Sequence, residues 1–159
     1  MEPQVYLSRL NEILIKKQAL LREILDLTRQ QKEALASDSL DELEILIAKK
    51  QTKMDAVDKL DEQFVVYLEG LKRSLGIKTL DELPAFQIPG AAELKENTAA
   101  VLGILHEIKA VDDENTASMK RKLEEAKDRV NQSNSFRKVS AAYFQRGQNL
   151  ASPYFDQKK

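Results

Sequence analysis

The sequence predicts an all-α fold, an antiparallel bundle of three long helices that pack in the manner of a coiled coil. Three observations lead to this class. Helix breakers are scarce, with 5 Gly and 4 Pro among 159 residues. Apolar residues recur at spacings of three and four, which is the period of one helix face. Charged residues make up 32% of the chain, above the roughly 25% average, as long solvated helix surfaces require.

The first predicted helix covers residues 3–36. Pro3 suits the first helical position, and neither Gly nor Pro follows it before residue 37. Two neighbouring apolar stripes run along this segment, one through Leu7, Leu14 and Leu21 and the other through Ile13 and Leu20. Because this face is wider than the seam of a two-stranded coiled coil, the helix is predicted to contact more than one partner helix.

The second predicted helix covers residues 39–75. Ser39 and Glu42 have the spacing of a capping box, in which each side chain accepts a hydrogen bond from a free backbone N–H. Gly76 follows the last apolar residue, as a helix-ending glycine does. The short break between the first two helices predicts that they are antiparallel neighbours.

The third predicted helix is the longest and covers residues 91–136, since no proline occurs between Pro89 and Pro153. Its last third is predicted to lie uncovered within a monomer, because the two partner helices are shorter. The sequence thus predicts a helical bundle over residues 1–136. Residues 137–159 are predicted to form a C-terminal tail that is partly helical or disordered.

Charge and aromatic residues divide the chain in the same way. Residues 1–115 hold 15 basic and 22 acidic side chains, whereas residues 116–159 hold 10 basic and 4 acidic ones. Five of the nine Phe and Tyr residues lie in the last 24 positions. The third helix is therefore predicted to project into a basic, aromatic C-terminal tail.

Composition argues against most enzymes. The chain has no Cys and one His, His106, so neither a thiolate metal site nor a multi-histidine zinc site is available. We expect no catalytic residue, no cofactor and no metal. The run Asp112-Asp113-Glu114 is predicted to be a solvated face, because consecutive helical positions do not converge on one ion. Asn115 has two open interpretations, a buried register-setting amide or a boundary residue. Gly103 also has two, a close helix approach or a surface glycine.

The sequence also predicts a cytoplasmic protein without stable membrane insertion. The N-terminus lacks the basic and apolar regions of a signal peptide. The longest apolar run, residues 99–105, is far below the ~18 residues of a membrane span. A net charge of −1 and the absence of a known motif argue against nucleic acid as the partner, although Lys120-Arg121-Lys122 is a basic run.

The candidate binding surface lies at the C-terminal end of the third helix and just beyond it. Apolar residues there have spacings that place several of them on one helix face, which suits recognition of an amphipathic partner helix. Folding back onto the bundle and self-association are equally compatible with this pattern. The predicted partner-binding residues are Leu123, Val130, Phe136, Val139, Tyr143 and Phe144.

Residues 25–64 carry the most specific resemblance in the chain. A leucine-rich helix is followed by a short acidic break, by Leu40-Asp41-Glu42-Leu43, and by a Glu- and Lys-rich helix that holds the pair Lys50-Gln51. A Leu-Gly turn, here Leu75-Gly76, and a long third helix complete the order. In this pattern the chain resembles the FlgN family of flagellar export chaperones over most of its length.

The resemblance implies a cytoplasmic binding protein that is not an enzyme. Such chaperones hold hook-filament junction proteins through their C-terminal helices, prevent premature assembly and deliver these clients to the export gate. The family is thought to use the C-terminal part of its last helix. Two other functions stay open: a structural coiled coil that forms a homodimer through the third helix, and an adaptor whose basic tail binds a membrane or nucleic acid.

Overall fold

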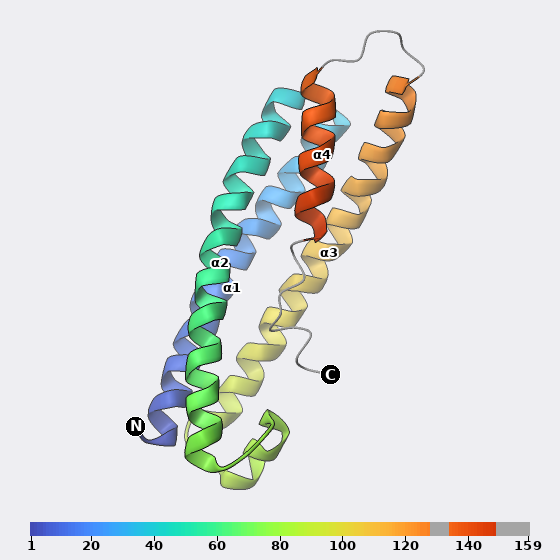
Figure 1. Cartoon of the computed structure of the whole chain (residues 1–159). Helices are drawn as coiled ribbons and strands as arrows, with labels where there is room; N and C mark the ends of the chain where they lie inside the picture. The colour runs from blue at the N-terminus through green and yellow to red at the C-terminus, as the bar shows by residue number, and fades with distance from the viewer. Residues whose placement is uncertain (128–133, 149–159) are drawn as a thin grey trace.

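The computed structural model describes residues 1–127 and 134–148 as helices joined by short connections (Figure 1). The elements are α1 (Pro3–Ala36), α2 (Leu40–Leu75), the 3₁₀ helix η1 (Leu80–Phe86), α3 (Ala91–Lys127) and α4 (Asn134–Gln148). The described part of the chain contains no strand, so the predicted all-α class is confirmed.

The helices run alternately up and down (Figure 1). α1 packs along both α2 and α3, while α4 packs against α2 and α3 and covers their ends near the α1–α2 turn. Lys17 of α1 pairs with Asp61 of α2, and Gln31, later in α1, accepts a hydrogen bond from Lys50, which is earlier in α2. The two helices are therefore antiparallel. α4 returns antiparallel to α3 and adds a short fourth helix to the predicted three.

The segment predicted as one helix over 91–136 is divided into two. α3 ends at Lys127, and α4 begins at Asn134 and continues to Gln148, inside the predicted tail. Asn134 and Ser135 open α4, and these residue types favour helix starts over helix interiors. The prediction relied on the absence of Pro and Gly and so missed this polar boundary. Residues 128–133 and 149–159 lie outside the described part of the chain.

Helix ends follow the predicted chemistry in part. Gly76 has φ 68° and closes α2 in the left-handed conformation. The predicted capping box at Ser39 is wrong, because the Ser39 side chain makes no capping hydrogen bond and lies 3.1 Å from the Ser37 hydroxyl instead. A capping box does form at η1, where the Glu82 carboxylate accepts hydrogen bonds from the backbone N–H groups of Lys78 and Thr79.

Two apolar clusters fill the bundle. The larger lies between α1, α2, α3 and η1 and includes Leu14, Phe64 and Ile108. The second lies around the α1–α2 turn and joins all four α-helices; its buried members are Ala34, Leu35, Leu43, Leu46, Ile47, Met119, Val139 and Tyr143. Met119 is fully buried, and Leu123 and Ala126, in the described part of the last third of the predicted helix, are half-buried, so the prediction that this third lies uncovered within a monomer is wrong for the residues that the structure describes. α4 supplies the missing cover.

Candidate functional site

The surface beneath α4 is the candidate site, since three of the six predicted partner-binding residues, Val139, Tyr143 and Phe144, pack there. We call it the seat. It comprises the α2 and α3 residues that share the second cluster with α4, together with the buried carboxylate of Asp112, and its members are Leu43, Leu46, Ile47, Asp112 and Met119. Val139 and Tyr143, one helical turn apart on α4, pack into this cluster and are 1% and 3% exposed.

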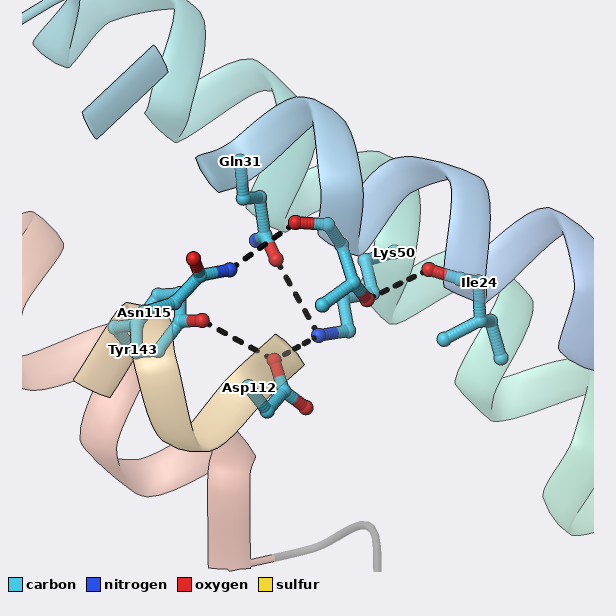
Figure 2. A network of polar contacts seen from close by, with 7 residues as sticks. Ile24, Gln31, Lys50, Asp112, Asn115 and Tyr143 are labelled. Atoms are coloured by element: carbon cyan, nitrogen blue, oxygen red, sulfur yellow. Dashed lines mark hydrogen bonds and ion pairs between the residues drawn. The ribbon is translucent and has the colours of Figure 1, made fainter. Parts of the chain in front are cut away.

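A buried polar network links all four α-helices at the edge of the seat (Figure 2). The Lys50 ammonium of α2 donates to Asp112 Oδ1 of α3 at 2.8 Å and to Gln31 Oε1 of α1 at 3.3 Å. The Tyr143 hydroxyl of α4 donates to the same Asp112 oxygen at 3.1 Å. One carboxylate oxygen therefore holds α2 and α4 to α3, and it lies where water does not screen the charges.

Asn115 continues this polar layer toward α1. Its amide nitrogen donates to the backbone carbonyl of Thr28 at 3.1 Å, and the Thr28 hydroxyl donates to the Ile24 carbonyl at 2.7 Å. Asn115 is buried, so the structure decides between the two interpretations of the sequence in favour of the buried amide. Because the Asn115 side chain of α3 donates this hydrogen bond to a backbone carbonyl of α1, the bond restricts how α3 can slide along α1.

The electrostatics of the site keep Tyr143 protonated. Burial is the main cause that raises the pKa of the Tyr143 phenol, and the negative charge of Asp112 raises it further, while the Asn115 amide opposes the shift. The phenol is therefore a hydrogen-bond donor at neutral pH. Asp112 Oδ2 has no hydrogen-bond partner among the residues that the structure describes.

The structure brings only some of the predicted partner-binding residues together. Val139, Tyr143 and the half-buried Phe144 share one side of α4, and the Lys120 ammonium lies 6.0 Å from the centre of the Phe144 ring. Leu123 is half-buried on α3. Val130 and the side chain of Phe136 lie outside the described residues.

Sequence reasoning missed the buried carboxylate at the centre of the site. The prediction that Asp112 lies on a solvated face is wrong, whereas Asp113 and Glu114 are exposed as predicted. A signal was available, because Asp112 follows Ile108 by four residues and Lys50 interrupts the apolar stripe of the second helix. A cation and an anion at two core positions indicate that they pair, since a buried charge needs a partner.

Several other candidate residues are surface features. His106 and Gly103 are exposed, and a side chain added at Gly103 would meet open space, so this glycine does not serve a close helix approach. Lys122, in the basic run, pairs with Asp38 in the α1–α2 turn. Within residues 1–127 and 134–148, no three His, Cys, Asp or Glu side chains form a group that suits a metal ion. None of the helices in those ranges is long and apolar enough to cross a membrane.

Comparison with known proteins gives one match. A family model described as FlgN protein matches residues 1–151, which is nearly the whole chain and includes the seat and α4. No curated protein and no solved structure matches the chain.

Proposed function

The chain belongs to the FlgN family of flagellar export chaperones, and we propose that it binds the terminal helices of hook-filament junction proteins in the cytoplasm. Binding would keep these clients from assembling prematurely and deliver them to the export gate. The proposed contacts are the predicted partner-binding residues, Leu123, Val130, Phe136, Val139, Tyr143 and Phe144.

One observation carries the proposal. The region that sequence reasoning marked for helix binding holds an amphipathic helix, because α4 buries one apolar side on α2 and α3. A client helix with a similar apolar stripe presents the same kind of surface. The cover also comes from the same chain, so this apolar surface does not require a second copy, which favours a chaperone over a structural dimer.

Client binding requires α4 to move. Val139 and Tyr143 are buried against the bundle, so a client cannot reach them while α4 is docked. Once α4 swings away, its apolar side and the seat both become available, and the client helix lies between them. The larger apolar cluster contains no α4 residue and remains intact as the scaffold.

Charge supports an acidic client. Residues 116–159 hold 10 basic and 4 acidic side chains, and Arg137 and Lys138 are exposed on α4. Such a region attracts an acidic segment and accelerates its association at low salt. Because a client helix that is disordered before binding loses conformational entropy, the affinity is expected to be moderate and the complex reversible.

The double substitution V139D/Y143D tests the proposed function. It places charges on the apolar side of α4 and is expected to abolish client binding, while the helices of the larger cluster remain folded. Size-exclusion chromatography with light scattering would compare a whole hook-filament junction protein with one that lacks its C-terminal helix. A complex is expected only between the unmodified chaperone and the whole client.

The matched control is I15D/V66D, which also introduces two charges but at side chains that are 53% and 67% exposed and belong to neither cluster. It is expected to bind the client as the unmodified chain does. Binding of the truncated client, or equal binding by V139D/Y143D, would refute the proposed site. The absence of any complex with the whole client would refute the proposed function.

A further inference from the structure

The seat has a chemical requirement that an apolar surface alone would not have. Asp112 is 6% exposed, and α4 lies over it. Its Oδ1 accepts hydrogen bonds from the Lys50 ammonium and the Tyr143 hydroxyl, while its Oδ2 has no partner within the described ranges (Figure 2). The surface that receives α4 therefore contains a buried anion with acceptor capacity to spare.

We propose that the seat selects amphipathic helices that carry a hydrogen-bond donor opposite Asp112, and that α4 occupies the seat only until such a helix takes its place, with α4 then packing its apolar side on the client helix. The proposal rests on the proposed function, because the replacing helix is the terminal helix of the client. It adds what the client helix must present: an apolar face interrupted by one donor-bearing side chain such as Tyr, Asn, Gln, Ser or Thr.

The donor is required because the site is closed to water when a helix covers it. A helix with a wholly apolar face would cover Asp112 and offer it no hydrogen bond. Among the described residues, the carboxylate would then keep the Lys50 ammonium as its donor and lose that of Tyr143. A buried acceptor that loses its partner costs more than the bond itself contributes, so such a helix binds less well. Sites that bury an acceptor discriminate strongly against ligands that lack the matching donor.

The arrangement of the clusters makes the replacement feasible. α4 has 15 residues, and its described buried side chains are Val139, Ser140 and Tyr143. The larger cluster does not depend on them. Because α4 is tethered to the bundle, its local concentration at the seat is high, so a client must offer more contact than α4 to displace it. A client helix longer than α4 meets this condition.

The first test follows the position of α4. The chain has no cysteine, so two cysteines at the exposed positions Ala48 on α2 and Ala141 on α4 would carry spin labels without further substitution. Pulsed electron resonance is expected to give one short distance in the free protein and a longer, broader distribution with the client. In the Y143F background, which removes the donor but keeps the ring, the longer distances are expected to increase roughly tenfold in population.

The second test exchanges the chemistry of the seat. A synthetic C-terminal helix of a hook-filament junction protein would be compared with a version in which the donor on its apolar face is replaced by Leu. The unmodified chain is expected to prefer the donor peptide roughly tenfold. The variant K50M/D112L replaces the buried ion pair by apolar side chains and is expected to lose this preference.

The outcomes separate the two proposals. If the client forms a complex and the label distance does not change, the proposed function stands and the replacement of α4 is refuted. The donor requirement is refuted if the unmodified chain and K50M/D112L prefer the donor peptide equally, or if Y143F leaves the distribution of label distances unchanged. If the whole client forms no complex in light scattering, the proposed function fails, whatever the labels report for the free protein.

Discussion

At the scale of single residues, the polar interruptions of the apolar stripes pair with one another. Lys17 of α1 donates to Asp61 of α2 at 2.6 Å, and Lys50 pairs with Asp112. A buried ion pair stabilises little in total, because both charges lose their hydration. A wrong register would nevertheless leave these charges without partners, so we infer that the pairs specify how the helices align.

The first prediction concerns the Lys50–Asp112 pair. Replacing Lys50 with Met leaves the Asp112 carboxylate buried without its cation, and the free energy of unfolding is expected to fall by about 3–5 kcal/mol. The double variant K50M/D112L removes both charges and is expected to recover most of that loss. Urea unfolding of the two variants, monitored by circular dichroism, measures both values.

The exposed pair Lys109–Asp113 is the matched control, since it is also an ion pair of α3. Replacing Lys109 with Met is expected to change stability by less than about 1 kcal/mol, because water screens exposed charges. Equal losses at Lys50 and Lys109 would contradict the argument from burial.

The second prediction concerns pH and Asp58. Partial burial, followed by the negative charges of Asp61, Asp55 and Glu62, raises the pKa of the Asp58 carboxyl above its ordinary value of 3.8, while Lys17 opposes the shift. A raised pKa means that the charged form destabilises the folded state at neutral pH, and this penalty disappears as the pH falls through the folded pKa.

Replacing Asp58 with Asn is therefore expected to stabilise the protein at pH 7, by at most about 0.5 kcal/mol, because water screens the charge of this exposed residue. Below pH 3.8 the gain is expected to vanish, because the carboxyl of the unmodified protein is then protonated in both states. Urea midpoints at pH 7 and pH 3 check this. A gain that is the same at both values would show that charge is not the cause.

At the scale of elements, two glycines have opposite roles. Gly76 closes α2 with φ 68°, which an L side chain rarely adopts, and Gly103 lies exposed inside α3 with open space around it. Gly76→Ala is expected to cost about 1 kcal/mol, because Ala at this φ strains the backbone. Gly103→Ala is expected to gain about 0.5–1 kcal/mol, because Ala favours the helix interior. Thermal unfolding of both variants tests whether the two substitutions change the stability in opposite directions.

The helices also show what sequence reasoning could predict and where it stopped. The bounds of α1 and α2 lie within one residue of the predicted 3–36 and 39–75, because Pro3 and Gly76 mark ends by their backbone chemistry. The end of α3 had no such marker. The surface that buries Tyr143 was also not predictable, because spacing places this residue on an apolar helix face but does not say which surface receives that face.

At the scale of the whole molecule, stability is unevenly distributed. α1, α2 and α3 share the larger cluster, whereas α4 is held by its contacts with the seat and the Tyr143 hydroxyl. We expect α4 to open separately from the rest. Hydrogen exchange is expected to show the amides of residues 138–146 exchanging at least roughly tenfold faster than those at the centres of α1 and α3. Uniform exchange would indicate a single cooperative unit and contradict a separable α4.

The division into two clusters has a consequence for how such a protein acquires new specificities. Substitutions in Leu43, Ile47 or Met119 alter the second cluster and leave the larger one unchanged. If client helices dock on the seat as we propose, a combinatorial library at these positions should yield many folded members that differ in the helices they accept. Recognition can diversify in this architecture while the scaffold is inherited intact.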